Sequence, residues 1–494
     1  MARKKSLFQN NIENQGELFI AIAFFLLCFF IRFPFFFRDY IDHDESTFIL
    51  MGQSLVDGNL PYTALWDLKP PFVFYFFGAV IALFGKSFIA IRLAGVFVIS
   101  ITTWFVYLIG KSIKSKRFGF YNGIGYIVLS SLFGTMQGVM SEHLAMVFCV
   151  AGVYIFVKGR DSLGGLFLSA VLLGISIMFR LNLVYAIFVL YVVYIFSSKL
   201  TVRQFFLRGF IISVGVVLAT GLGFLPYVIQ GIPEVWWNSV VKASLDYAGS
   251  GSGRMFDVAK SLLPVVIIWL TGFIYSRKIA FFQPKDKNVW YLRIFTGALM
   301  FMLIKGGRLN GHYLVQLFPF MLFFVLEVFS LINFKKLSPV RFLLYILLLI
   351  PIESYIEYAK LGQRISQGKS LYNGPSFEVT QYIKDQSSSN ESSLFLYYHI
   401  SYWLLDVDPP SKIGTHPSNL LRSYLYSNVE GSKENPMAEM RSLFESRPSY
   451  VVNRSERLPF GSRSSEANKY YQKQIAENYT LVKEFGRAKV YRRK

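Results

Sequence analysis

The sequence predicts a mainly α-helical, polytopic membrane protein with a C-terminal soluble α/β domain. Of its 494 residues, 53% are hydrophobic and 16% are charged, whereas soluble domains carry about 25% charged residues. Apolar runs recur over 1–357, and the longer ones reach the roughly 20 residues that a helix needs to cross a bilayer. Polar residues dominate 358–494, so we expect a separate domain there.

Basic loops set the expected orientation. Met1–Lys5 is basic, so the positive-inside rule places the N-terminus in the cytoplasm. A first crossing, Glu17–Phe37, then leads to an outer loop over 38–71. The next run, Phe72–Phe84, is short, and a full crossing there would put the basic residues after Phe88–Ile109 outside. We therefore expect a re-entrant or half-buried helix at Phe72–Phe84 and a second crossing at Phe88–Ile109.

Further apolar runs alternate with basic loops down the chain. Crossings are expected at Phe118–Gly138, Leu144–Val157, Leu163–Phe179, Leu183–Phe196, Phe210–Val228, Ser261–Tyr275, Trp290–Ile304, Leu314–Ile332 and Phe342–Ile356. Together with the crossings Glu17–Phe37 and Phe88–Ile109, these make about eleven crossings. The membrane is expected to be the cell membrane, that is, an inner or plasma membrane. The C-terminal domain then lies on the outer face.

Two segments outside the expected helices have a recognisable character. The outer loop Gln230–Lys260 has a Gly/Ser-rich tip, which is typical of a lid or of a plain connector. In the C-terminal domain, short strands are expected at Leu394–Tyr398, Tyr450–Val452 and Lys489–Tyr491.

The charge and the cysteines exclude several classes of function. The net charge is +21, but the lysines and arginines gather in loops on one predicted side. They therefore indicate orientation and contact with anionic lipids, and not nucleic-acid binding. Cys28 and Cys149 lie inside apolar runs and are expected to be buried apolar residues, not a disulfide or metal ligands. No cleavable signal peptide is expected, because the first apolar run is long and lacks a cleavage site.

Three carboxylates fall on the predicted outer face: Asp44, Glu45 and Glu142. Acidic groups close to lipid are costly and are usually kept for a function. One of them can act as a general base for an incoming hydroxyl or amine, and another can orient it.

Cations and aromatic rings fall on the same face. The cations are Lys69, Arg180, Arg308 and His312, and the rings are Tyr62 and Tyr313. The cations suit the phosphate at the head of a lipid, while the tyrosines can stack on or hydrogen-bond a sugar. A transferase that uses a sugar linked to a lipid phosphate needs this combination, because it must neutralise a leaving phosphate and accept a proton.

The first outer loop resembles that of the GT-C glycosyltransferases. The matching segments are Asp44-Glu45, Gly58–Tyr62, Trp66–Pro71, Leu83–Gly85 and Arg92-Leu93. Within GT-C, the chain is most similar to the branch that holds the protein O-mannosyltransferase-like enzymes and the aminoarabinose transferase of lipid A. The resemblance continues more loosely through Ser141–His143, Gly174 to Arg180, and Arg308 to Pro319.

The resemblance implies a polyprenyl-phosphate-sugar donor and inversion at the anomeric carbon. By this likeness Asp44 is the general base with Glu45 beside it, and Lys69 lies near the donor phosphate. Glu142 stands where the family has a second acid, which is often aspartate. Arg180 and Arg308 match by position more than by motif, and the likeness implies contact with the donor phosphate for both. Family members are described with and without a divalent metal, so a metal stays open, although the residues around His43 match no standard ligand spacing.

Plainer roles exist for each of these residues. Asp44 and Glu45 can complement a helix N-terminus, and Glu142 can cap the next helix. Arg180 and Arg308 can anchor helices at the interface, Lys69 can belong to a turn, and Arg32 in the first crossing is expected to be structural.

Two other functions compete with glycosyl transfer. A transporter or flippase of a charged lipid or solute would place charges near the midplane and show repeats, and neither is visible. A non-catalytic anchor would only display the C-terminal domain. The sugar, the polyprenol length and the acceptor, whether glycolipid, polysaccharide or protein, are not readable from the residues.

Overall fold

A computed structural model describes most of the chain, as two compact units. The described residues are 12–250, 254–275, 287–330, 350–386, 391–455, 458–459 and 466–494. Unit 1 comprises Met1–Pro34, Arg92–Gly223 and Ser250–Ala359, and unit 2 comprises Phe35–Ile91, Phe224–Gly249 and Lys360–Lys494. Each unit is therefore assembled from segments that are far apart in the sequence.

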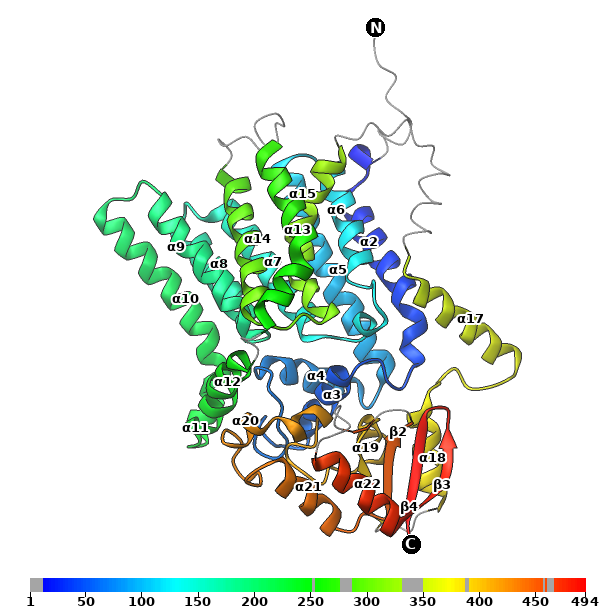
Figure 1. Cartoon of the computed structure of the whole chain (residues 1–494). Coiled ribbons are helices and arrows are strands. Elements are labelled where there is room, and N and C mark those ends of the chain that lie inside the picture. The colour runs from blue at the N-terminus through cyan, green and yellow to red at the C-terminus, as the bar shows by residue number, and fades with distance from the viewer. Residues whose placement is uncertain are drawn as a thin grey trace. The chain divides into compact units, whose positions relative to one another are not determined.

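Unit 1 is built from apolar helices. They are α2 (Glu17–Arg32), α5 (Phe88–Ile113), α6 (Lys116–Leu129), α7 (Ser141–Gly159), α8 (Leu163–Ile177), α9 (Val184–Ser197), α10 (Val202–Ile229), α13 (Met255–Tyr275), α14 (Lys287–Lys305) and α15 (Phe318–Ser330); α5 and α10 continue into unit 2. α7 packs along α8, and α9 along α14 (Figure 1). Large apolar side chains stay exposed on α10, for example Phe206 and Val217, as expected of surfaces that face lipid.

Four helices of the described part are long and apolar enough to cross a bilayer. They are Glu17–Phe37, Phe88–Ile113, Ser141–Gly159 and Val202–Ile229. The chain is accordingly an integral membrane protein. The count of about eleven crossings stays a prediction, and the last of them, Phe342–Ile356, lies largely outside the described residues.

The expected crossing Phe118–Gly138 is helical only in its first part. α6 ends at Leu129, and a 3₁₀ turn follows at Gly134–Gln137. Arg32 explains how the backbone leaves the helix inside unit 1, because its guanidinium donates to the carbonyls of Met136, Gln137 and Gly138 at 2.7–2.8 Å. Arg32 is buried, so these bonds satisfy both the charge and the carbonyls. Its predicted structural role agrees with this placement.

Unit 2 begins with two short helices that pack closely. α3 (His43–Val56) contacts α4 (Phe72–Phe84). A Cβ atom at Gly52 would lie 2.7 Å from the Cβ of Phe77, so only glycine allows this approach. α4 has 13 residues and is about 20 Å long, too short to cross a bilayer of about 30 Å. The predicted limits of this helix are correct, while its depth in the membrane stays a prediction.

The C-terminal part of unit 2 is α/β, as expected. A four-stranded sheet has the order β1-β2-β4-β3, with β1 (Ser393–Phe395), β2 (Tyr450–Arg454), β3 (Tyr479–Phe485) and β4 (Ala488–Arg493). β1 and β2 are parallel, and the other pairs are antiparallel. The helices α18 (Pro375–Gln386) and α22 (Glu466–Asn478) contact this sheet, as Figure 1 shows. This part also contains α19 (Ile400–Leu405), α20 (Ser423–Tyr426) and α21 (Pro436–Glu445), and α17 (Ile352–Ser366) leads into it from unit 1.

The expected loop after residue 230 is largely helical. It contains α11 (Pro233–Trp236), a π-helix at Trp237–Lys242 and α12 (Ala243–Gly249). The Gly/Ser-rich tip continues into 251–253, outside the described residues. The Trp66 indole donates to Ser239 Oγ at 2.9 Å, which ties this segment to the first outer loop within unit 2.

Candidate active site

The start of α3 holds the acids that the sequence singled out. Asp42 is the N-cap residue, and its Oδ1 accepts the backbone N–H of Asp44 at 2.9 Å. Asp44 and Glu45 follow in the first turn, where negative charge complements the helix dipole. Since Asp42 performs the capping, the carboxylate of Asp44 is available for other partners. Glu45 is buried beside it.

Asp44 and Lys69 form an ion pair. Lys69 Nζ lies 3.0 Å from Asp44 Oδ2, and both side chains are 15% exposed. Lys69 Nζ also lies 5.4 Å from the centroid of the Phe48 ring, a favourable cation–π distance. The structure thus brings together a carboxylate and an amine that keep some access to solvent.

Tyr62 supports the loop that carries Lys69. Its hydroxyl donates to the Lys69 carbonyl at 2.5 Å, its φ is +71°, and its ring contacts Phe74 and Tyr227. The side chain is buried. We predicted a sugar contact for Tyr62. The structure places the ring in the packing of unit 2, where it supports the loop, and its contact with a sugar stays a prediction.

Three histidines surround Asp44. His416 Nε2 lies 3.3 Å from Asp44 Oδ1, and the ring of His43 lies 5.4 Å from that of His416 and 5.6 Å from that of His399. Burial, and then the neighbouring His43 and His416, hold the pKa of His399 well below its usual value. Within the described ranges, no three His, Cys, Asp or Glu side chains are arranged to hold a metal ion.

Among the acids at the start of α3, Asp42 has a raised pKa. Burial, and then the charges of Asp44 and Glu45, together raise the pKa of Asp42 to about 7, against the opposing effects of the backbone hydrogen bond from Asp44 and the charge of Lys69. Three carboxylates so close together cannot all ionise easily. Asp42 therefore keeps its proton to a higher pH than an ordinary aspartate, which reduces the repulsion among the three acids.

A second polar cluster lies in unit 1, at the start of α7. Arg180 NH2 lies 2.9 Å from Glu142 Oε1, and the Glu142 side chain is fully buried. Ser141 Oγ donates to Glu142 Oε2 at 3.2 Å. The backbone N–H of Met140 is instead accepted by His143 Nδ1 at 3.3 Å. The acid is thus paired with a cation and does not cap the helix.

The 3₁₀ segment Gly311–Gln316 completes this cluster. The Arg180 guanidinium lies 4.8 Å from the centroid of the Tyr313 ring, and His312 Nε2 lies 4.0 Å from Glu142 Oε1. Arg308 has a different partner, because it donates to Ser250 Oγ at 2.7 Å.

The structure therefore groups the predicted residues in two sets. Asp44, Glu45 and Lys69 are neighbours in unit 2, and the unit 1 set consists of Glu142, Arg180, His312 and Tyr313. Sequence reasoning missed His399 and His416, since both come from the C-terminal part and no local pattern relates them to Asp44. Their roles, and those of the predicted residues, remain predictions.

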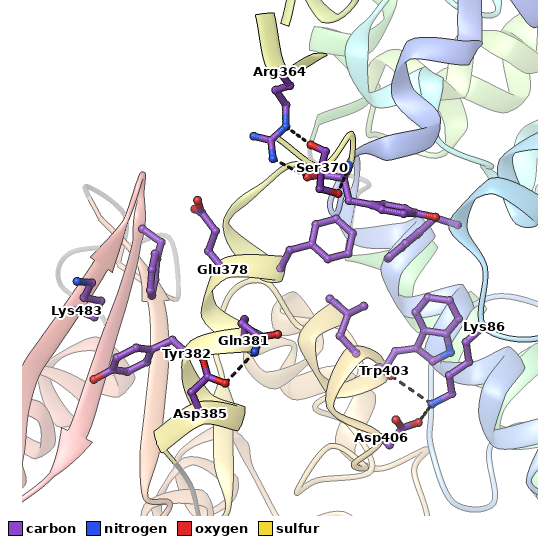
Figure 2. Close-up of a pocket in the computed structure, with 15 residues that line it drawn as sticks. Lys86, Arg364, Ser370, Glu378, Gln381, Tyr382, Asp385, Trp403, Asp406 and Lys483 are labelled. Carbon is purple, nitrogen blue, oxygen red and sulfur yellow. Dashed lines mark hydrogen bonds and ion pairs between the residues drawn. The ribbon is translucent and has the colours of Figure 1, made fainter. Parts of the chain in front are cut away.

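A cleft of about 810 Å³ lies elsewhere in unit 2 (Figure 2). Aromatic and charged residues line it, from the turn before α5 to β3: Lys86, Phe88, Arg364, Ser370, Tyr372, Phe377, Glu378, Gln381, Tyr382, Asp385, Trp403, Leu404, Asp406, Lys483 and Phe485. Much of its polar lining is already paired. Lys86 binds Asp406 and the Trp403 carbonyl, and Gln381 donates to Asp385. We assign it no ligand.

Comparison with known proteins identifies the fold. A family model for dolichyl-phosphate-mannose-protein mannosyltransferases matches residues 68–228. The structure is similar to that of ArnT from Cupriavidus metallidurans bound to undecaprenyl phosphate, with a TM-score of 0.60 at 13% identity, covering 96% of this chain and 97% of that one. The chain has the GT-C fold. The apo form of the same ArnT gives a TM-score of 0.62 at 12% identity, with the same coverage.

An archaeal relative of this fold is also similar. The apo oligosaccharyltransferase of Archaeoglobus fulgidus has a TM-score of 0.52 at 12% identity, covering 91% of this chain and 70% of that one. No curated protein sequence matches the chain. The resemblance to GT-C glycosyltransferases that the first outer loop suggested is thereby confirmed.

Proposed function

We propose that this protein is a membrane glycosyltransferase. It moves a sugar from a polyprenyl-phosphate donor to a glycolipid, glycan or protein acceptor on the outer face of the cell membrane. The observation that carries the proposal is the partly exposed Asp44–Lys69 pair in a chain with the GT-C fold. The likeness to an ArnT bound to undecaprenyl phosphate supports a donor of this lipid class.

Asp44 is the proposed general base. The acceptor oxygen or nitrogen forms a bond to the anomeric carbon, and the bond from that carbon to the phosphate oxygen breaks. The proton of the acceptor passes to Asp44, and polyprenyl phosphate leaves with the electron pair. A single displacement of this kind inverts the anomeric carbon. It needs a carboxylate within hydrogen-bond reach of the acceptor.

Lys69 is the proposed contact to the donor phosphate. Its ammonium can exchange Asp44 for a phosphate oxygen, which neutralises charge as the phosphate leaves. Arg180, Arg308 and His312 are further candidates for phosphate contact, Tyr313 for the sugar, and Glu142 for the second acid. Because Glu142 already pairs with Arg180, we assign it an orienting role.

The test compares glycans between strains. Lipids and envelope glycans are measured by mass spectrometry with the gene deleted and with it restored as wild type, Asp44→Asn or Lys69→Ala. We expect a sugar modification that is lost on deletion, and lost again in both variants, because a general base contributes roughly 10²- to 10⁴-fold.

The matched control is Asp57→Asn, an exposed acid at the C-terminal end of the same helix, which should restore the product. Full product with both Asp44→Asn and Lys69→Ala would overturn the proposal. Movement of the donor lipid without sugar transfer would favour a flippase instead.

A further inference from the structure

A segment of the C-terminal part, residues 412–419, runs along the first outer loop within unit 2. We call this segment the strap. Its hydrogen bonds to the loop and to α3 are Trp66 N–H to the Lys412 carbonyl at 2.9 Å, Thr415 Oγ1 to the Trp66 carbonyl, Thr47 Oγ1 to the Thr415 carbonyl at 3.0 Å, and Asn419 Nδ2 to Asp67 Oδ1 at 3.2 Å. Thr47, Trp66, Thr415 and Asn419 are fully buried. The strap is therefore fixed against the loop that carries Lys69.

The strap also fixes the proton of His416. The backbone N–H of Ser418 donates to His416 Nδ1 at 3.2 Å, and the Ser418 hydroxyl, whose Oγ lies 2.8 Å from Nδ1, can donate to the same nitrogen. A backbone amide can only donate, so Nδ1 carries no proton, and the single proton of the neutral imidazole lies on Nε2. Nε2 lies 3.3 Å from Asp44 Oδ1. Hence His416 donates to Asp44.

Asp44 is consequently held through both of its oxygens. Lys69 binds Oδ2 and His416 binds Oδ1. If Lys69 turns to a phosphate, as proposed above, the bond from His416 still orients the carboxylate. Further titratable groups around Asp44 include Tyr40, Asp42, Glu45, His43 and His399.

We infer that His416 is a positioning residue that aims the Asp44 carboxylate, and that the strap completes the active site from the C-terminal part of the chain. This inference rests on the proposed function for its kinetic consequence, but the contact itself is independent of any activity. His416 acts through Asp44 and does not touch the reacting atoms.

The first experiment tests the contact without substrate. Full-length protein with ¹⁵N-labelled histidine is placed in lipid nanodiscs, and the His416 signals are assigned by their loss in His416→Gln. We expect an unprotonated Nδ1 and a protonated Nε2, with the Nε2 signal shifting in Asp44→Asn. A proton on Nδ1, or an Nε2 signal indifferent to Asp44→Asn, would overturn the inference.

The second experiment uses two amides. In His416→Gln the amide nitrogen reaches the place of Nε2, whereas in His416→Asn it stops near that of Nδ1. We expect His416→Gln to keep most of kcat, and His416→Asn to lose on the order of 100-fold with the donor KM nearly unchanged. The exposed Lys433→Ala should behave as wild type.

Thermal unfolding of both variants separates positioning from folding. A loss of kcat without a matching loss of stability supports the inference, and equal kcat in His416→Gln and His416→Asn overturns it. If the wild-type protein transfers no sugar, the proposed function fails, and the nitrogen spectra alone decide whether His416 holds Asp44.

Discussion

Lys69 Nζ lies 3.0 Å from Asp44 Oδ2, so the cation and the acid neutralise each other when no ligand is bound. Tyr62 fixes the backbone of Lys69, because its hydroxyl donates to the carbonyl of that residue. Under the proposed function, a donor phosphate that binds Lys69 competes with Asp44 and releases its carboxylate, so donor binding and activation of the base are predicted to be one event.

Lys69→Met tests this coupling. The variant keeps the length of the side chain and removes its charge, so binding of undecaprenyl phosphate to purified protein in nanodiscs should weaken. A hydrogen bond to a charged group is worth about 1.5–3 kcal/mol, or roughly 10- to 150-fold in Kd. Lys69→Arg should lose less, because it keeps the charge. An unchanged Kd in Lys69→Met would show that the phosphate binds elsewhere.

Asp42 should give the stability of the protein a characteristic pH dependence. Its pKa is raised from 3.8 to about 7, so between about pH 4 and pH 7 the folded protein holds a proton that the unfolded chain has released. Stability therefore falls as the pH rises through this window. Asp42→Asn should remove that part of the slope, measured as thermal unfolding in detergent at several pH values.

A companion variant separates the charge of Asp42 from its capping role. Asn caps helices as well as Asp, whereas Asp42→Ala loses the bond to the Asp44 amide and should be about 1 kcal/mol less stable than Asp42→Asn at every pH. If Asp42→Asn and wild type show the same slope, another group titrates in the window.

The Glu142–Arg180 pair predicts strong coupling between two substitutions. Removing one member of a buried ion pair costs about 3–5 kcal/mol, because a charge is left in an apolar surrounding. Glu142→Gln and Arg180→Gln should each destabilise the protein, and the double variant should be more stable than their sum predicts. Unfolding of all four proteins measures the coupling. Simple additivity would mean that the pair contributes little.

Arg32 should affect folding and leave donor binding unchanged. Arg32 reaches the three carbonyls from two separate nitrogens, and the single nitrogen of Lys cannot reproduce this arrangement. Each buried carbonyl left unpaired costs about 1–3 kcal/mol. Arg32→Lys should therefore unfold at a clearly lower temperature. Its Kd for undecaprenyl phosphate should match the wild-type value. The reverse result, normal stability with weaker binding, would make Arg32 a ligand contact.

The apolar periodicity of the sequence, together with the prolines and glycines at the ends of its elements, predicted much of the fold. α4 has its predicted limits because Pro70 and Pro71 precede it and Gly85, with a φ of +71°, ends it. The predicted strands overlap β1, β2 and β4. The apolar residues on which those predictions depended are buried in these strands. β3 was missed, since five of its seven residues are exposed at the edge of the sheet and its apolar and polar residues do not alternate.

The candidate site was predictable only where its residues are close in sequence. Asp44 and Glu45 lie in the first turn of α3, Lys69 lies in the loop that follows α3, and a family pattern covers all three. His416 reaches Asp44 through tertiary packing, and nothing near it in the chain indicates that contact. The ring of Tyr62 packs on that of Tyr227 from a third segment, and this contact too has no signal in the local sequence.

The seating of the strap on the first outer loop has a consequence for biosynthesis. The ribosome delivers Asp44 to the membrane long before it makes His416, and all the intervening helices must insert in between. Until then the loop lacks the hydrogen bonds that fix Trp66 and Thr47. Contacts between segments so distant in the chain form late. A nascent or truncated protein therefore has Asp44 without the proposed positioning contact from His416, and we expect it to be inactive.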